Sequence, residues 1–344
     1  MIILITGAAG FIGAHIVEHI LKNTNWNLVL MCRLSHAGDM QRLIEIGDGV
    51  NNFVNLVEDG RVRIIYHDFA FGISTRMIEE IGVIDGVFHI GASTHVDDSI
   101  LDPLRFVRDN VLGTAQMLEY VRNYTKSVCT TMPKFIYFST DEVFGPTSYK
   151  GFSEWDRYHS GNPYAATKAG AEELCLAYHN TYGVPVIVTH CMNVFGERQA
   201  TSKFIPKCIG HILHNVKMSI HANKERTKAG SRFYIHARNV ASAVLFVYEK
   251  GEIGQKYNIV GEQEVGNLEM LNFIHTIMRE EKVITETHRL RYELVDFHSC
   301  RPGHDLRYAL SGEKLHDMGW KQPVDFIGSL TRTVQWTLKH PRWL

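Results

Sequence analysis

The sequence predicts an α/β protein built on a doubly wound parallel sheet, and two observations carry that prediction. First, an apolar run of Ile and Leu at the start of the chain leads at once into Gly7, Gly10 and Gly13. Such a run suits a strand that is buried on both faces, and the apolar residues after it recur at helical spacing. Second, apolar runs alternate with helical patterns through the first half of the chain. This alternation is typical of a parallel sheet joined by right-handed crossovers.

The three glycines lie at the turn between the first strand and the first helix. There they allow a tight turn, close approach of backbone N–H groups to a pyrophosphate, and close packing of helix on strand. The N-terminus of the helix would face the anion. An ordinary glycine-rich turn is the alternative, but the position of this one within a βαβ unit favours dinucleotide binding.

The remaining elements follow in order along the chain. Strands are expected at 28–31, 63–66, 86–90, 135–139 and 186–190. Helices are expected between them at 16–21, 114–124 and 165–182. Beyond about residue 195 the pattern loosens, with a polar loop at 224–231 and helical patterns at 268–279 and 326–338.

This order of elements predicts a chain in two parts. Residues 1–195 would form a dinucleotide-binding domain of the Rossmann type that also carries the catalytic residues. Residues 196–344 would form a smaller C-terminal lobe that binds the substrate, with the chain crossing between the two parts more than once. Ligands of such sheets lie in the crevice beyond the C-terminal ends of the strands, which is where the second lobe would sit.

Composition narrows the class of protein further. The chain has 344 residues, 45% of them apolar, and a net charge of −1 with both signs interspersed, which argues against a nucleic-acid partner. Its six cysteines are far apart and form no CxxC pair, and its 19 histidines show no metal-ligand spacing. The chain starts directly with the first strand and contains no apolar stretch long enough for a membrane span. We therefore expect a cytoplasmic protein without a disulfide framework, a metal or a membrane anchor.

The residue that would contact the adenosine ribose departs from the usual pattern. An Asp or Glu closing the second strand normally accepts hydrogen bonds from the 2′-hydroxyl, but here Cys32 is followed by Arg33 and Ser35. A guanidinium and a hydroxyl can bind a 2′-phosphate, so local charge favours NADP. Alternatively, Arg33 stacks on the adenine and NAD binds without its usual acid. Asp68, after the third strand, is either an adenine contact or a turn residue.

A second group of polar residues follows the strand expected at 135–139. Thr140, Asp141 and Glu142 come where this strand ends and the crevice opens. Tyr164 and Lys168 stand four residues apart at the start of a strong helical pattern, so both project from one face. A nearby Lys and an oxidised nicotinamide can lower the pKa of a phenol, which makes the Tyr a base for hydride transfer. The alternatives, a solvated helix face and a solvated acidic loop, do not explain why these residues occur together.

The chain at this point resembles the extended short-chain dehydrogenases/reductases, and within them the nucleotide-diphosphate-sugar 4,6-dehydratases, of which the dTDP-glucose enzymes are one group. The STDEV segment is the most specific of the motifs, because epimerases and decarboxylases of this fold generally lack the Asp-Glu pair. The motifs that carry the resemblance are TGAAGFIG (6–13), STHVDDSI (93–100), STDEVFG (139–145), NPYAATKAGAEEL (162–174), RPGHDLRYAL (301–310) and QWTL (335–338).

The resemblance implies a reaction that forms a 4-keto-6-deoxy sugar from a dTDP- or UDP-glucose-like substrate. Tyr164, helped by Thr140 and Lys168, would take the proton of the 4-hydroxyl while hydride passes from C4 to the nicotinamide. Glu142 would then remove the C5 proton, Asp141 would protonate the departing 6-hydroxyl, and the hydride would return to C6. The family uses NAD, bound tightly and regenerated in each turnover.

The expected binding residues follow from the patterns above for the cofactor and from the resemblance for the substrate. The cofactor would contact residues of the glycine turn, of the second and third strand ends and of the catalytic helix, namely Gly7, Gly10, Phe11, Ile12, Gly13, Arg33, Ser35, Asp68, Phe69, Tyr164 and Lys168. The sugar pocket would include His95, and the nucleotide diphosphate would contact Asn193, Lys203, Arg232, Asn267, Arg301 and His304. Ser202 replaces a usual Glu, and a longer loop at 223–231 precedes Arg232. The nucleobase and the sugar therefore stay open.

Three further expectations complete the interpretation. The helical patterns at 114–124 and 165–182 carry apolar residues on more than one face, and the resemblance implies a homodimer with a four-helix interface. The apolar residues in question are Met117, Leu118, Val121, Leu174, Leu176 and Tyr178. A nucleotide-sugar epimerase or decarboxylase of the same fold is the alternative activity. A redox-sensing binding module is the alternative class of protein, but it would not need Tyr164, Lys168 and the acidic pair.

Overall fold

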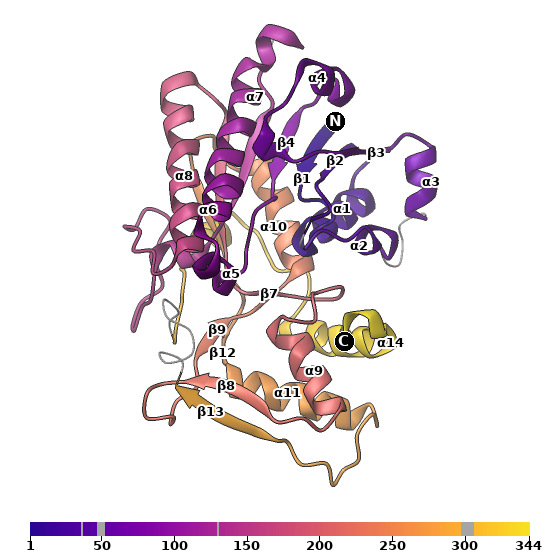
Figure 1. Ribbon diagram of the computed structural model, residues 1–344, viewed down its shortest axis with the longest axis vertical. Helices are drawn as coiled ribbons and strands as arrows, with labels where there is room; N and C mark the ends of the chain where they lie inside the picture. Colours follow the sequence, from indigo (N-terminus) through magenta and orange to yellow (C-terminus); the bar gives the residue numbers. More distant parts are fainter. Residues whose placement is uncertain (36, 47–51, 129–130, 297–305) are drawn as a thin grey trace.

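The computed structural model describes residues 1–35, 37–46, 52–128, 131–296 and 306–344 (Figure 1). Its centre is a seven-stranded sheet in the order β11-β6-β5-β4-β1-β2-β3, with every neighbouring pair parallel. The strands are β1 (Ile2–Thr6), β2 (Asn27–Cys32), β3 (Val62–Tyr66), β4 (Gly86–His89), β5 (Lys134–Thr140), β6 (Val186–Cys191) and β11 (Lys256–Ile259). The chain winds outward from β1 in both directions, which confirms the doubly wound fold predicted from the sequence.

Helices cover both faces of this sheet (Figure 1). On one face, Ile3 and Ile5 of β1 pack with residues of α1 (Phe11–Asn23) and α10 (Ala237–Lys250). On the other face, Leu4 packs in a second core with α4 (Thr75–Ile81), α7 (Gly113–Ser127) and α8 (Pro163–Tyr182). Alternate residues of one strand thus serve the two cores, because successive side chains point to opposite faces.

Three short helical segments lead from β4 into α7. They are α5 (Val96–Leu101), α6 (Pro103–Phe106) and the π-helical η2 (Val107–Leu112). Asp102 accepts a hydrogen bond from the Arg105 backbone N–H, and Pro103 occupies the first turn of α6. This run brings residues 93–109 beside the C-terminal ends of β2 and β3, where the cofactor was expected.

The C-terminal lobe has its own core, formed by α9 (Phe204–Leu213), α11 (Asn267–Glu280) and α14 (Phe326–Lys339). The last two confirm the helices expected at 268–279 and 326–338. Strand β8 (Met218–Ala222) pairs in parallel with β13 (Tyr292–Asp296) at the far end of this lobe (Figure 1). Two short pairs lie between this end and the main sheet: β7 (Val194–Phe195) with β10 (Ile235–His236), and β9 (Ser231–Phe233) with β12 (Glu264–Gly266).

Element boundaries differ from expectation mostly at helix starts. Helix α1 begins at Phe11 rather than at residue 16, so its first turn lies within the glycine motif. Several short elements were not expected at all: α2 (Gln41–Ile44), α3 (Phe53–Glu58), η1 (Phe69–Phe71), η3 (Asp141–Phe144), α13 (Glu313–Asp317) and η4 (Pro341–Trp343). Segments this short give no periodicity to read.

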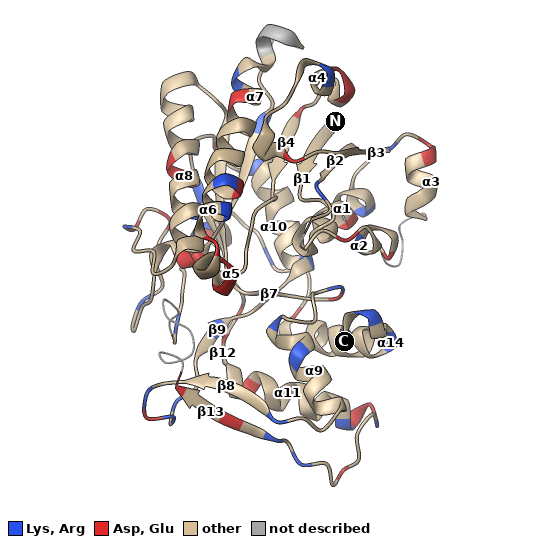
Figure 2. Ribbon diagram, viewed as in Figure 1, with Lys and Arg blue, Asp and Glu red and all other residues tan. Residues whose placement is uncertain are grey.

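Charged side chains of both signs are interspersed over the two lobes (Figure 2). Within the described ranges, no helix combines the length and the apolar character that crossing a bilayer requires.

Candidate active site

The glycine turn has the geometry of a cradle for a ligand. Gly7 adopts φ +67°, and a Cβ on it would come within 2.6 Å of the Gly91 backbone. A Cβ on Gly13 would lie 2.2 Å from the Gly7 carbonyl oxygen, and one on Gly10 would lie 3.0 Å from it. Helix α1 then starts at Phe11, and the first N–H groups of a helix have no acceptor within it. These features fit a dinucleotide pyrophosphate, which needs close approach of backbone and a helix N-terminus.

The adenosine end of the expected cofactor site differs from the sequence-based expectation in one respect. Cys32 is buried at the end of β2, and burial raises the pKa of its thiol to about 11. Arg33 was expected to offer free donors to a 2′-phosphate. Instead, its Nη1 donates to Asp68 over 3.2 Å and its Nη2 donates to Asp109 over 3.0 Å. Both terminal nitrogens of Arg33 are therefore engaged by carboxylates.

An open cavity of about 510 Å³ lies at this end of the site. Its lining combines expected cofactor residues from the strand ends with a group from the run after β4: Arg33, Ser35, Asp68, Ser93, Arg105 and Arg108. The sequence did not point to Ser93, Arg105 or Arg108. It did not point to Asp109 either, whose carboxylate accepts hydrogen bonds from three residues of the lining. The STHVD motif includes Ser93, but nothing in the sequence alone says which face of the following helices turns toward β2.

Phe69 contributes differently from what was expected. Its ring is buried in the core, edge-on to His89 at 4.9 Å between centroids. It also fills the space beside Gly91 and Gly113, where a Cβ would come within 2.6 Å and 2.5 Å of the ring. A contact between Phe69 and an adenine would therefore come from its main chain.

The acidic pair follows β5 directly, in the short helix η3. Thr140 closes the strand and caps the turn, its Oγ1 accepting from the Glu142 N–H at 3.4 Å and donating to Asp141 Oδ1 at 3.0 Å. Asp141 is 5% exposed, and within the described part of the chain its Oδ2 has no hydrogen-bond partner. An unpartnered buried carboxylate oxygen is costly unless a ligand completes its bonding.

Two effects raise the pKa of Asp141 to about 7. The larger is burial, which disfavours the charged form, and the second is the negative charge of neighbouring Glu142. The positive charge of Arg232 and the hydrogen bond with Thr140 oppose them without cancelling them. Asp141 therefore holds a proton near neutral pH beside a second carboxyl group.

Tyr164 and Lys168 project from the start of α8, which Asn162 caps by accepting from the Ala165 N–H at 2.9 Å. Burial and then the charge of Glu142 raise the pKa of Tyr164, and a hydrogen bond with Thr140 opposes them. Lys168 is buried, which lowers its pKa to about 7. Its Nζ donates to the Phe138 carbonyl at 2.6 Å and lies 4.3 Å from the centre of the Tyr137 ring. The structure thus brings Tyr164 beside Thr140 and the acidic pair.

Residues of the C-terminal lobe approach this group from the other side. Arg232 of β9 is close enough for its charge to act on Asp141, and its guanidinium lies 4.7 Å from the centre of the Tyr308 ring. Its Nη1 donates to the carbonyls of Ser231 and Leu306, both at 2.7 Å. Asn267, which begins α11, accepts from the Tyr234 hydroxyl at 2.7 Å. Of these two expected substrate residues, Arg232 therefore lies near the acidic pair, whereas the Asn267 side chain is bonded to Tyr234.

The other expected substrate residues lie on separate segments of the chain. His95 directly precedes α5 and its Nδ1 lies 3.4 Å from Asp98 Oδ1, Asn193 lies exposed between β6 and β7, and Lys203 precedes α9. Arg301 and His304 lie outside the described residues. The polar loop before Arg232 forms a turn in which Asn223 Oδ1 accepts from the N–H groups of Thr227 and Lys228.

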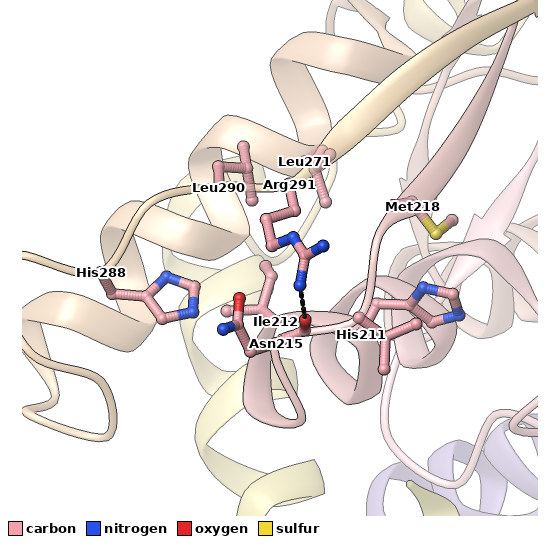
Figure 3. Close-up of a pocket in the computed structure, with 9 residues that line it drawn as sticks. His211, Ile212, Asn215, Met218, Leu271, His288, Leu290 and Arg291 are labelled. Atoms are coloured by element: carbon pink, nitrogen blue, oxygen red, sulfur yellow. Dashed lines mark hydrogen bonds between the residues drawn. The ribbon is translucent and has the colours of Figure 1, made fainter.

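A separate depression on the C-terminal lobe is not a second ligand site (Figure 3). The Arg291 side chain extends into it, donating to the Asn215 carbonyl at 3.0 Å. It leaves no space for a water molecule. Among the described residues, no three His, Cys, Asp or Glu side chains gather as a metal site.

A glycine cradle after β1, a Tyr and a Lys one helical turn apart in α8, and a Thr at the end of β5 define an extended short-chain dehydrogenase/reductase. The acidic pair that follows the same strand is typical of a narrower group of enzymes within this family. The family profile described as GDP-mannose 4,6 dehydratase matches residues 4–333. The chain belongs to this family of nucleotide-sugar dehydratases.

Several relatives match along nearly the whole chain. The dTDP-glucose 4,6-dehydratase of Neisseria gonorrhoeae is 33% identical, covering 98% of this chain and 95% of the relative. That of Shigella flexneri is 31% identical over 100% of this chain and 94% of the relative. The crystal structure of DesIV, the dTDP-glucose 4,6-dehydratase of Streptomyces venezuelae with NAD bound, has a TM-score of 0.83 at 28% identity, covering 100% and 98% of the two chains.

Proposed function

We propose that this protein is an NAD(P)-dependent nucleotide-diphosphate-sugar 4,6-dehydratase that acts on a dTDP- or UDP-glucose-like substrate. The observation that carries the proposal is the buried Asp141, which keeps a proton near neutral pH and has an unpartnered oxygen beside Thr140, Glu142 and Tyr164. Relatives of matching length are dTDP-glucose 4,6-dehydratases, and one of their structures holds NAD. A bound nicotinamide dinucleotide would supply the acceptor and later the donor of a hydride.

The first half of the reaction needs a base at the 4-hydroxyl. Tyr164 takes this proton, and Thr140 holds the same hydroxyl from the strand end. The phenol of Tyr164 is a poor base without help, since burial and Glu142 both raise its pKa. Lys168, one helical turn away, supplies a positive charge that favours the phenolate when its amine is protonated, which its pKa of about 7 makes dependent on pH.

The second half needs an acid and a base on neighbouring atoms of the sugar. Once C4 is a ketone, the proton on C5 becomes acidic and Glu142 removes it. Asp141 donates its proton to the departing 6-hydroxyl, which leaves as water. Two carboxyl groups serve these opposite roles because their environments separate their proton affinities, and Asp141 is the more deeply buried of the two.

The nucleotide diphosphate would bind on the side of the C-terminal lobe. Arg232 is suited to a phosphate because a guanidinium binds phosphate oxygens in a fork. Asn193, Lys203, Asn267 and His95 complete the expected contacts, and residues 196–344 would supply most of this lobe. The loop at 223–231 lies next to Arg232 and would meet the nucleobase, so we place base selectivity there.

Product analysis tests the activity. The purified protein is incubated with dTDP-, UDP-, GDP- and CDP-hexoses, and products are followed by mass spectrometry. Loss of one water from a substrate, with a 4-keto product, is the expected result. An unchanged mass with inverted stereochemistry would mean an epimerase, and loss of carbon dioxide from a hexuronic acid would mean a decarboxylase. Structural likeness to the Thermus thermophilus UDP-glucose 4-epimerase, at 23% identity and a TM-score of 0.79, concerns the fold alone.

We also propose a homodimer, although on different residues from those singled out in the sequence. Met117, Leu118 and Val121 of α7 are buried in the protomer's own core. Exposed apolar residues instead lie on the preceding run, where Leu101 is 84% and Leu104 is 78% exposed. A second copy packing on α5, α6, α7 and α8 would cover them in a twofold interface.

Light scattering on the wild type and on Leu104→Asp tests the dimer. The expected result is twice the chain mass for the wild type at micromolar concentration and a shift toward the monomer for the variant. A wild-type mass of one chain would overturn the proposal. Val54→Asp, a change of the same kind at an exposed apolar residue of α3, serves as the control.

Cytoplasmic location is the remaining part of the proposal. The described cysteines Cys32, Cys175, Cys191 and Cys208 are free thiols, and all four are buried. Unpaired thiols are the rule in a reducing compartment.

A further inference from the structure

The carboxylate of Asp109 is the central acceptor of the cavity at the adenosine end. It lies in η2, its side chain is 0% exposed, and it accepts hydrogen bonds from three side chains. Ser93 Oγ donates to Oδ2 at 2.8 Å, Arg33 Nη2 donates to the same oxygen at 3.0 Å, and Arg108 donates to Oδ1 through Nε and Nη2 at 3.0 and 2.8 Å. Burial alone would raise the pKa of Asp109, but these donors outweigh it and lower that pKa.

Arg33 is thereby fixed between two carboxylates. Its Nη2 donates to Asp109 in η2, and its Nη1 donates to Asp68, which follows β3. Arg33 is the residue that follows Cys32, so it sits where a 2′-phosphate of the adenosine ribose would need a cation. Each terminal nitrogen already gives one N–H to a carboxylate, so a phosphate at Arg33 would have to share the guanidinium with Asp68 and Asp109 and would meet their negative charges.

The other two guanidinium groups that line the cavity also have carboxylate partners. Arg108 is bidentate to Asp109, and Arg105 Nη2 lies 3.5 Å from Asp98. Asp68 itself lines the cavity, so a phosphate that approached Arg33 would meet a carboxylate as well. A ribose with a free 2′-hydroxyl meets no such repulsion, and it can donate to a carboxylate oxygen.

We infer that Asp109 sets the dinucleotide selectivity of this cavity: by holding Arg33 against η2 it keeps the guanidinium from a 2′-phosphate, so that the protein selects NAD over NADP. The inference rests on the proposed function, because it takes the cavity to be the adenosine end of a dinucleotide site. It reverses the preference that the sequence alone indicated for Cys32 and Arg33. The sequence shows the cation but not the buried carboxylate, 76 residues further along, that engages it.

The test measures binding and does not depend on turnover. The protein, freed of bound dinucleotide, is titrated with NAD⁺ and with NADP⁺ by calorimetry. The wild type is expected to bind NAD⁺ at least tenfold more tightly. Asp109→Asn keeps the shape of the side chain but releases the charge on Arg33, and is expected to tighten NADP⁺ binding about tenfold while changing NAD⁺ binding less than threefold.

Three further variants test whether the released Arg33 produces this gain. In Asp109→Asn combined with Arg33→Ala, the gain for NADP⁺ should disappear, because Arg33 is the donor that was released. Asp59→Asn, an exposed carboxylate just after α3, makes the same change of net charge away from the cavity and should leave both affinities unchanged. Asp68→Asn removes the less buried partner of Arg33 and should shift selectivity in the same direction as Asp109→Asn, which covers the case of a poorly folded Asp109 variant.

The outcomes distinguish this inference from the proposed function. Equal wild-type affinities for the two dinucleotides, or a gain for NADP⁺ that persists without Arg33, would overturn the selectivity role of Asp109. If the wild type bound neither dinucleotide, the proposed function itself would fail.

Discussion

Asn162 joins the acidic turn to the catalytic helix: its Nδ2 donates to Glu142 Oε2 at 3.1 Å while its Oδ1 accepts from the Ala165 N–H at 2.9 Å. One side chain thus caps α8, which carries Tyr164, and holds the carboxylate that follows β5. The relative position of the proposed first base and the proposed second base depends on this residue. In the segment Asn162-Pro163-Tyr164, the Asn therefore positions the acidic turn against the helix, in addition to the role proposed for Tyr164.

Replacing Asn162 separates these two roles. Asn162→Ala should lower the free energy of unfolding by about 1 kcal/mol through the lost cap and should lower kcat as well. Asn162→Asp keeps an acceptor for the cap but puts a charge against Glu142, so its stability should stay near that of the wild type at neutral pH while kcat falls. Chemical denaturation and steady-state kinetics on the two variants give the comparison. Equal loss of stability in both would contradict the capping role.

Asp141 should make both activity and stability depend on pH. Its pKa of about 7 in the folded protein lies above the ordinary value near 4, so the folded state binds the proton more tightly than the unfolded state. Stability is therefore highest where Asp141 is protonated and falls as the pH rises from about 4 to 7. Asp141 loses the proton that it would donate to the 6-hydroxyl as the pH passes its pKa of about 7, so kcat for elimination should decline above that pH.

The variant Asp141→Asn checks the sign of this effect. It cannot ionise, so its stability relative to the wild type should be higher at pH 8 than at pH 5, by a difference on the order of 2 to 4 kcal/mol in unfolding free energy, measured by urea denaturation. Its dehydratase activity should be lost at both pH values. A constant offset between variant and wild type at the two pH values would show that Asp141 is already ionised in the folded protein.

Much of this architecture can be read from sequence, and the reason is local. The strands of the central sheet are buried on both faces, so β1, β5 and β6 appear as continuous apolar runs, and the helices between them keep a clear period. The catalytic residues follow at strand ends and helix starts, where position along the chain fixes position in space. Thr140 and Tyr164 could therefore be assigned to the same crevice before their contacts were known.

What could not be read depends on pairings between distant segments. The sequence shows Arg33 as a cation without a partner, because its partner Asp109 is distant in the chain. Asp109 lies in a π-helical segment, whose sequence has no apolar periodicity that would predict its orientation. The loop Glu197–Arg198 is another case, since both side chains look like solvated charges in sequence but are buried. Their partners come from α1, α10 and α14, which only the folded chain brings together.

Glu197 should be a stability residue for that reason. It is 1% exposed and accepts hydrogen bonds from Arg238 at 2.8 Å and Arg332 at 2.9 Å, with His236 at 3.3 Å. Burial raises its pKa, but the nearby His15 and His236 rings and the charge of Arg238 outweigh burial and lower it.

Glu197→Ala should cost on the order of 3 kcal/mol, because it removes the buried carboxylate that faces Arg238, Arg332 and the buried His236. Arg332→Ala, which removes a half-exposed partner of the same carboxylate, should cost less than about 1 kcal/mol. Equilibrium unfolding in urea measures both. A small effect of Glu197→Ala would mean that water or a rearranged side chain replaces the carboxylate.

The order of events in the proposed reaction gives the last prediction. Tyr164→Phe removes the base that acts before the ketone exists, so hydride transfer from C4 should not occur. Glu142→Gln leaves that step possible and removes the base that acts only on the ketone, so oxidation at C4 should proceed and elimination should stop. Mixing each variant with substrate in a single turnover, and following the absorbance of the reduced nicotinamide, should show no signal for Tyr164→Phe. For Glu142→Gln it should show a signal that rises and persists, whereas the wild-type signal rises and decays as the hydride returns to C6.

Because Glu142 also raises the pKa of Tyr164, removing its charge should make the phenol a stronger acid, so the oxidation step of Glu142→Gln should keep its rate at a lower pH than in the wild type. Equal amounts of reduced cofactor in the two variants would show that the tyrosine and the glutamate do not divide the reaction in this way.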